Sequence, residues 1–472
     1  MRRGGTRARP RRIGRLLVDV SPLRESRDYR FLFAGQAVAQ LGSQITVVAI
    51  PFQVYLLTRS SLAVGMIGLV SLLPLVTLSL IGGAVADAVD RRKLLLVTQA
   101  SLGATSAVLA LNAHRSHPAL WPLYACAALT AGLAGVDLPT RNAVLPNLVR
   151  REQFTAAAAL GQVLFQVGQV AGPALAGLII GRVSVAAAFW VDASTSLVAM
   201  GMTLAIRPQP PEGGGTRAGI ASIREGLAYL HGRRMLIGTF VIDIDAMVFG
   251  MPRALFPALG TGLYGGGAAT VGLLYAAPGA GALLGALLTG WVGRVRRQGW
   301  AVIVAVIGWG AAIAGFGLVA WLPLGLVLLA VAGAADVVSA VFRNTILQLS
   351  VPDALRGRLS AVHIAVVTGG PRLGDAEAGA VAALAGPRFS VVSGGLACIV
   401  GALVIGRLLP ELTHYDAVAD AGADAGAAAV DLAPGGAPEP PSYTARPGSP
   451  TTATGQDEAP GPDRRRVEGG SR

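Results

Sequence analysis

The chain has 472 residues, of which 53% are hydrophobic and only 14% are charged, and its formal net charge is +13. Soluble domains carry about 25% charged residues, so this composition excludes an ordinary soluble enzyme or binding domain of this length. The basic residues lie in short segments between apolar runs of the length that crosses a bilayer, rather than on one domain. The sequence therefore predicts a polytopic membrane protein that does not bind nucleic acid.

Twelve apolar segments follow a basic N-terminal tail, residues 1–30, and each predicts one transmembrane helix. They do not alternate polar and apolar residues as the strands of a membrane barrel do. We therefore expect an all-α integral membrane protein with twelve transmembrane helices in two pseudo-symmetric six-helix halves. The expected spans are 31–57, 63–86, 94–113, 119–140, 157–180, 184–206, 235–258, 268–291, 299–320, 323–345, 361–385 and 390–409.

A polar segment in the middle of the chain, 207–234, separates an N-terminal half, 31–206, from a C-terminal half, 235–412. Its second part, IASIREGLAYLHGRR, places isoleucines and leucines on one helical face, which indicates an amphipathic helix on the inner membrane surface. Residues 413–472 show no apolar periodicity and are predicted to be a disordered cytoplasmic tail.

The loop charges predict the orientation of the chain. Arginine-rich loops follow the second, fourth, sixth, eighth and tenth spans, and cytoplasmic loops carry an excess of basic residues. Both termini of this multi-pass cell-membrane protein are therefore expected in the cytoplasm. The opposite loops carry single arginines, which are Arg59, Arg115, Arg182, Arg253 and Arg388.

The loop after the second span carries GGAVADAVDRR, which contains Gly83, Asp87, Asp90, Arg91 and Arg92. A glycine permits close helix packing, and an acid can accept bonds from the free N–H groups of a neighbouring helix start. The two arginines can pair with acids across an inner gate between the halves. We interpret this run as an inner-gate motif; the alternative is that its charges only set the topology.

The fifth span carries Gly168, Gly172, Pro173 and Gly177. Small residues at this spacing, with a proline, predict a smooth, kinked helix face. The face either forms a rigid seam between helices or serves ordinary helix packing.

Charged residues within the spans cost ~2.5–3.5 kcal/mol each, so each is expected to face a cavity or a partner. Asp137 and Arg141 lie on one helical face and can pair, and so can Arg372 and Asp375. The candidates for coupling or binding are Asp137, Arg141, Asp243, Asp245, Asp336, Arg343, Arg372, Asp375 and Glu377.

Asp243 and Asp245, in the seventh span, have no basic residue in reach along their own helix, which makes one of them a candidate proton site. At 100° per residue they are separated by ~200°, so only one can face a central cavity well. Asp192, a lone acid in the sixth span, is expected to join helices.

Similar runs recur in the two halves: the fourth span ends in GVDLPTRNAVLPNLV and the tenth in ADVVSAVFRNTILQLSVP. Two repeats of six spans are typical of alternating-access transporters. The inner-gate run resembles the loop 2–3 signature of the major facilitator superfamily, although Ala88 stands where a basic residue is common and Asp90 where a glycine is common. The glycine run from 168 to 177 resembles the antiporter signature of the same superfamily, which is associated with exporters.

The stretches LPTRNAVLPNLV, MPRALFPAL and GGPRLGDAEAG resemble the siderophore and drug exporters of that superfamily, and the likeness covers roughly 22–412. It implies a monomeric secondary transporter that exports a siderophore or similar small natural product by alternating access, with protons as the coupling ion. A multidrug efflux antiporter for hydrophobic compounds is the alternative. Three intramembrane arginines favour an anionic or chelating substrate, namely Arg141, Arg343 and Arg372.

A membrane-embedded enzyme or a channel is the alternative from another class. The only lysine, Lys93, is followed by Leu94, so the chain lacks the lysine motif of a phosphate-binding loop. No catalytic motif or metal-binding spacing occurs among the five histidines and two cysteines. We therefore expect no enzyme activity, no catalytic residues, no metal site and no cofactor.

Overall fold

The computed structural model describes residues 19–210, 225, 228–351 and 353–415. Most of the expected basic tail, residues 211–224 and 226–227 of the linker and the tail beyond residue 415 lie outside the described residues, so the expected amphipathic linker helix is described only in part. Within the described part the regular elements are all helical.

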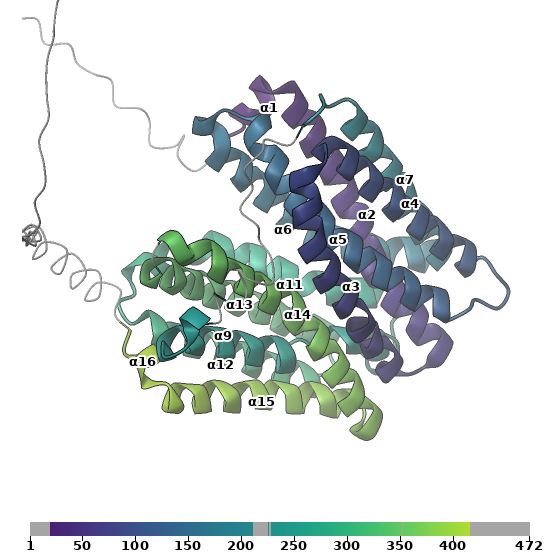
Figure 1. The fold of residues 1–472 in the computed structure, drawn as a ribbon. Coiled ribbons are helices and arrows are strands. Elements are labelled where there is room, and N and C mark those ends of the chain that lie inside the picture. Colours follow the sequence, from purple (N-terminus) through teal and green to yellow (C-terminus); the bar gives the residue numbers. More distant parts are fainter. Residues whose placement is uncertain (1–18, 211–224, 226–227, 352, 416–472) are drawn as a thin grey trace, which may run out of the picture. The chain divides into compact units, whose positions relative to one another are not determined.

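The first half contains six long helices (Figure 1). Its elements are α1 Ser21–Glu25, α2 Arg27–Thr58, α3 Ser61–Ala88, α4 Arg91–Ala113, α5 Trp121–Leu148, η2 Arg151–Gln153, α6 Phe154–Arg182 and α7 Val185–Leu204.

The second half repeats this arrangement, except that its first span is interrupted. Its elements are α9 Arg234–Phe249, η3 Arg253–Leu255, α10 Phe256–Ala258, η4 Leu259–Leu263, α11 Ala268–Leu288, η5 Thr289–Arg294, α12 Gln298–Leu318, α13 Leu322–Ser350, α14 Asp353–Ala385, α15 Pro387–Leu408 and α16 Pro410–Thr413.

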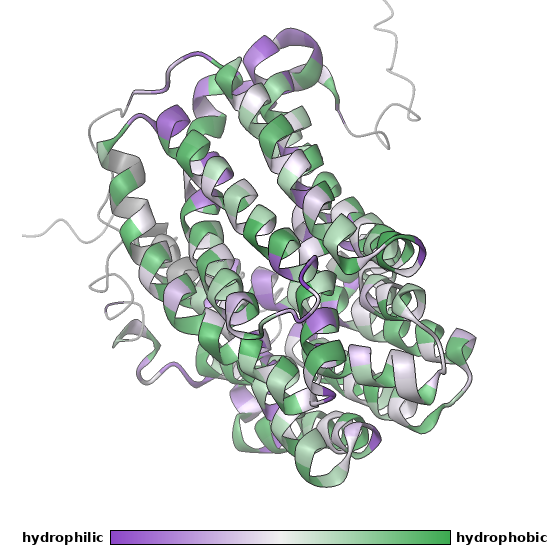
Figure 2. Ribbon diagram, turned by 90° about the vertical axis from the view of Figure 1, so that its right-hand side faces the viewer, coloured by the Kyte–Doolittle hydropathy of each residue, from purple (hydrophilic) through white to green (hydrophobic). Residues whose placement is uncertain are grey.

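Eleven helices of the described chain are long and apolar enough to cross a membrane. The remaining expected span, 361–385, lies in α14, which is long enough but carries Arg372, Asp375 and Glu377. The structure is consistent with the predicted twelve-helix membrane fold. Figure 2 shows hydrophobic residues along much of the length of the helices, as expected for helices that cross a bilayer.

Side-chain caps explain where several helices begin. The side chains of Ser26, Ser60 and Ser184 each accept a hydrogen bond from the backbone N–H three residues later, at the starts of α2, α3 and α7. Asp90 caps α4 in a similar way. Because Ser26 caps α2, this helix begins at Arg27, inside the segment expected to belong to the tail.

The two halves use the same helix pairings. In the first half α3 packs on α5, α4 on α7 and α2 on α6, and in the second half α11 packs on α13, α12 on α15 and α9 on α14. Two further pairs join the halves, α3 with α14 and α6 with α11. These pairings form a pseudo-symmetric arrangement, which a two-fold internal repeat predicts.

Glycines line both helix pairs that join the halves. A Cβ atom built on Gly177 of α6 would lie 2.8 Å from the carbonyl oxygen of Ala268 and 3.0 Å from Cα of Gly272 in α11. A Cβ on Gly65 of α3 would collide with the Asp375 carbonyl of α14. Both contacts lie toward the end where α2 joins α3 and α6 joins α7, so glycines allow the backbones to approach there.

Candidate transport site

A cavity of about 380 Å³ lies between the two halves. Helices α2, α3 and α5 line it from one half, and η3, α11 and α14 from the other. Most of its lining is apolar, with hydroxyl groups from serines and threonines, and its charged residues are Arg253, Arg372 and Asp375. Since it lies between two repeats, it is the best candidate for a substrate site in the described chain.

The interruption of the seventh span creates part of this site. After α9 the chain runs through Met251 and Pro252 into short helical turns rather than a continuous α-helix, because proline removes a backbone donor. The backbone N–H of Ala254 donates to Asp375 Oδ1 at 3.1 Å. Tyr275 Oη donates to the carbonyl oxygen of Arg253 at 3.0 Å. Interrupted membrane helices are typical of transporter binding sites because their backbone groups are free to bind.

Arg253 is the principal functional candidate that the sequence analysis missed. The sequence predicts a single loop charge here, but the structure places Arg253 in η3, where its side chain lines the cavity. Its buried Nε has no hydrogen-bond partner in the described structure. The signal in the sequence is the run MPRALFP, in which two prolines flank the arginine inside an apolar span.

Arg372 and Asp375 both line the cavity, but they do not form the predicted ion pair. Arg372 Nη1 donates instead to the carbonyl oxygen of Thr368, one turn earlier in α14, at 2.5 Å. Asp375 uses one oxygen for the Ala254 N–H. The backbone of η3 thus binds Asp375 in place of Arg372, the partner that helical spacing predicts.

Asp243 forms a buried ion pair. Its Oδ1 lies 2.8 Å from Arg343 Nη2 of α13, with 1% and 4% of the two side chains exposed. Arg343 Nη1 also donates to Ser339 Oγ at 3.1 Å. Asp243 lacks a basic partner along its own helix, but a neighbouring helix supplies one. Asp336 interacts electrostatically with both members of this pair.

Asp245 points to a different neighbour. A Cβ atom on Gly401 of α15 would collide with the Asp245 carboxylate, so Asp245 packs against α15 while Asp243 contacts α13. The predicted divergence of the two side chains is confirmed. Neither residue lines the cavity, and Glu377 of α14 does not line it either.

Asp137 and Arg141 form the predicted ion pair within α5, with Asp137 Oδ2 and Arg141 Nε 2.5 Å apart. Thr98 Oγ1 and Gln99 Nε2 of α4 donate to the other oxygen of Asp137 at 3.1 and 3.4 Å. Of the three arginines expected to favour an anionic substrate, Arg141 and Arg343 are therefore held by acids, and only Arg372 lines the cavity.

The inner-gate arginines bind carbonyl groups in their own half. Arg91 Nη1 donates to the Ala143 oxygen of α5 at 3.0 Å, and Arg92 Nη2 to the Leu204 oxygen at the end of α7 at 2.6 Å. Leu204 ends α7, where an arginine satisfies a free carbonyl group and interacts favourably with the helix dipole. The predicted pairing with acids of the other half is not seen for these two side chains in this structure.

Asp90 both caps α4 and binds the segment that follows α7. Its Oδ1 accepts hydrogen bonds from the backbone N–H groups of Arg92 at 2.9 Å and Gln209 at 3.1 Å. Gly83 and Asp87 lie in the last turns of α3. The surroundings of their side chains lie outside what the structure describes.

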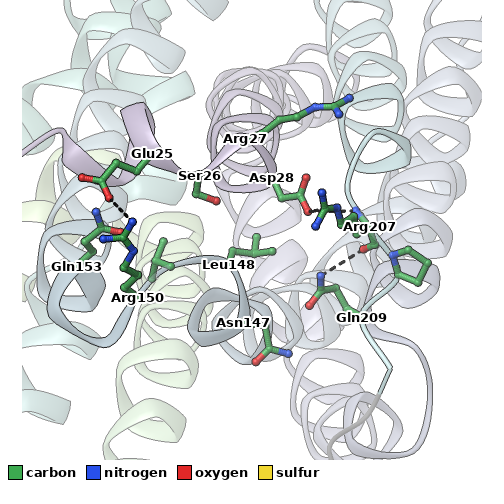
Figure 3. Close-up of a pocket in the computed structure, with 12 residues that line it drawn as sticks. Glu25, Ser26, Arg27, Asp28, Asn147, Leu148, Arg150, Gln153, Arg207 and Gln209 are labelled. Carbon is green, nitrogen blue, oxygen red and sulfur yellow. Dashed lines mark hydrogen bonds and ion pairs between the residues drawn. The ribbon is translucent and has the colours of Figure 1, made fainter.

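A second pocket, of about 640 Å³, lies near Asp28 at the start of α2 (Figure 3). Glu25 pairs with Arg150 at 3.2 Å, and Asp28 lies 4.0 Å from Arg207 Nε. All its lining residues belong to α1, the start of α2, the end of α5 and the turn that follows it, and the segment after α7. Since it lies within one half and its acids are paired, it is a weaker candidate for the substrate site.

The glycine motif of α6 contacts both halves. Gly168 packs on Gln40 and Gly172 on Gln44, both of α2, whereas Gly177 packs on α11. Pro173 lies between them and is buried. The motif therefore serves close packing within its own half and also forms part of the contact between the halves.

Asp192 of α7 joins three helices, as predicted. Its Oδ2 accepts hydrogen bonds from Thr46 Oγ1 of α2 and Ser106 Oγ of α4, both at 2.6 Å. Only 6% of the residue is exposed.

Replacing Asp192 by alanine should therefore lower the free energy of unfolding by about 1–3 kcal/mol, because two buried hydroxyl groups lose their acceptor. Thermal unfolding of the purified protein in detergent would measure the change. Asp192→Asn, which retains an acceptor oxygen, should have a smaller effect. Equal stability of the alanine variant and the wild type would contradict this assignment.

Comparison with known proteins agrees with the architecture. The chain is 27% identical over 399 residues to the enterobactin exporter EntS of Escherichia coli K12, covering 84% of this chain and 96% of the relative. The enterobactin exporter EntS of Citrobacter koseri matches with the same identity and coverage. Because the relatives are transporters, a membrane transporter is favoured over an enzyme.

Solved structures show the same fold. A bacterial homologue of the human lysosomal transporter Spinster matches with a TM-score of 0.67 and 13% identity, covering 84% of this chain and 99% of that one. A bacterial homologue of the iron transporter ferroportin matches with a TM-score of 0.59 and 14% identity, over 82% and 99% of the two chains. The profile described as "Transmembrane secretion effector", a major facilitator family, matches residues 18–434. The chain is a multi-pass membrane transporter and belongs to this family of the major facilitator superfamily.

Proposed function

We propose that the protein is a proton-coupled exporter of a siderophore or similar small natural product and works by alternating access. The observation that carries this proposal is the cavity between the two halves, lined by three elements of each. Similarity to the enterobactin exporter EntS over most of both chains supports export and the substrate class. We also propose that the protein acts as a monomer. The loop charges predict that both termini lie in the cytoplasm.

The contacts between the halves suit a reversible closure. At Gly65 and Gly177 the nearest atoms of the other half belong to the backbone. Such surfaces can separate without pulling large side chains out of pockets. We propose that these two contacts, the α3–α14 seam and the α6–α11 seam, open and close at the outer end. When the inner end closes, Arg91 and Arg92 exchange their carbonyl partners for acids.

The coupling proton is assigned to the acids of the second half. Asp243 and Asp336 share Arg343 as a cationic neighbour, so protonation of either acid changes the balance of a buried charge cluster. Asp245, which faces α15, is the alternative. Loss of gradient-driven efflux in Asp243→Asn, with substrate binding retained, would support the first assignment.

Multidrug efflux of hydrophobic compounds is the second candidate, because much of the cavity lining consists of Val, Ile and Ala. Everted membrane vesicles can separate the two. Energised vesicles should accumulate an iron-free catecholate siderophore, and dissipation of the pH gradient should abolish the uptake. Accumulation of a lipophilic cationic dye alone would favour the multidrug alternative, and uptake of the siderophore that is independent of the gradient would contradict proton coupling.

The orientation can be tested by reporter fusions in the first hairpin. A fusion after Arg59 should report the periplasmic or outer side, and a fusion after Lys93 should report the cytoplasm, since α3 lies between them. Activity of a reporter that functions in only one compartment measures this directly. The same compartment at both positions would contradict the topology.

A further inference from the structure

The charged groups of the central cavity are not balanced. Arg253 and Arg372 line it with Asp375, and the described lining contains no other acidic or basic residue. With all three groups ionised, two positive charges and one negative charge leave an excess of +1. A buried charge without a partner is costly, so a site with this excess favours a ligand that supplies a negative charge.

The arrangement of the three residues leaves guanidinium N–H groups of both arginines available, although Arg372 Nη1 donates to the carbonyl oxygen of Thr368. Asp375 already accepts the Ala254 N–H at 3.1 Å, and it interacts electrostatically with both arginines without forming an ion pair with either in the described structure. The two guanidinium groups also repel each other. The buried Nε of Arg253 has no acceptor. Asp336, which does not line the cavity, also interacts electrostatically with Arg253, but less strongly than with Arg343.

The rest of the cavity has a different character. Val47 and Ile50 of α2 and Val64 and Ile67 of α3 contribute apolar lining from the first half, whereas the charged groups come from the second. A volume of about 380 Å³ lies within the range of small-molecule sites, roughly 300–1,000 Å³. The site thus combines one cationic side with one apolar side.

We propose that the cavity binds a small organic acid whose single anionic group, a carboxylate or phenolate, is held between Arg253 and Arg372 while its apolar body lies against α2 and α3. Guanidinium groups bind such oxyanions through paired, charge-assisted hydrogen bonds. Asp375 acts as a positioning residue, because its bond to Ala254 holds the η3 turn that carries Arg253. The inference names the substrate class of the proposed function and therefore rests on it.

Binding to the purified full-length protein in lipid nanodiscs tests the inference without requiring transport. The probes are 2-naphthoate and biphenyl-4-carboxylate, each compared with its neutral primary amide, which has nearly the same shape. Each acid should bind roughly 10- to 100-fold more tightly than its amide, the ratio expected for a hydrogen bond to a charged group. Equal binding of acid and amide, or no binding of either acid, would overturn the inference.

Four variants test whether the preference for the acid depends on Arg253 and Arg372. Arg253→Gln and Arg372→Gln should each bring the acid-to-amide ratio close to one while changing amide binding little. Arg253→Lys retains the charge and should keep part of the preference. Arg115→Gln changes an exposed arginine in the loop between α4 and α5 and should leave the ratio unchanged. Retention of the full acid preference in both glutamine variants, with thermal unfolding like that of the wild type, would also overturn the inference.

The vesicle assay separates this inference from the proposed function. Acid-selective binding that depends on Arg253, combined with no gradient-driven export, would refute the exporter and leave the site assignment intact. Gradient-driven export without any acid preference would refute the site assignment alone.

Discussion

Replacing Arg343 by alanine should destabilise the folded protein by about 3–5 kcal/mol, because it leaves the carboxylate of Asp243 buried without its partner. The two side chains are 4% and 1% exposed, so water cannot solvate the remaining charge. Thermal unfolding in detergent, or the fraction of protein that inserts and remains monodisperse, would measure the loss. The expected effect is large because removing one partner costs more than the intact pair contributes.

Two comparisons make this prediction specific. The double variant Asp243→Asn, Arg343→Gln removes both charges and should recover much of the lost stability. Arg234→Ala breaks an ion pair with Glu411 in which both side chains are exposed, 64% and 43%, and should cost about 0–1 kcal/mol. Similar losses for Arg343→Ala and Arg234→Ala would show that the buried pair has no special importance.

Gly177→Ala should shift the protein away from the state in which α6 contacts α11. The new Cβ would lie 2.8 Å from the carbonyl oxygen of Ala268 and 3.0 Å from Cα of Gly272, and backbone atoms cannot rotate away. Overpacking of this kind costs about 1–3 kcal/mol, which changes the population of the closed seam by about 5- to 150-fold. The variant should therefore transport slowly even if it folds normally.

A cysteine introduced at Ser71, which lines the cavity, can report whether the α6–α11 seam is open. The native cysteines Cys126 and Cys398 are both buried and should react little. A membrane-impermeant thiol reagent added from the outer side should label this cysteine faster in Gly177→Ala. Gly161→Ala, in the same helix but with no atom within 4 Å of its new Cβ, should label and transport like the parent. Equal labelling rates for the Gly177 and Gly161 variants would contradict a role of this seam in closure.

The sequence by itself determined the features that depend on neighbouring residues. Apolar runs of bilayer length specify the spans, since a helix satisfies its own backbone groups in lipid. The Asp137–Arg141 pair was predictable because residues four apart meet on one helical face. The opposite directions of Asp243 and Asp245 follow from the same helical geometry.

Only the tertiary structure decided which helices supply the partners. Arg343 reaches Asp243 from α13, and the η3 turn reaches Asp375 from the interrupted seventh span, although no periodicity relates these positions. Arg253 changed from an expected loop charge to a cavity residue because α9 ends at Phe249 and the chain passes through Pro252 into the short turn of η3, which lines the cavity. Helical spacing specifies the direction of a side chain from its own helix, whereas the group it meets depends on how helices distant in the chain pack together.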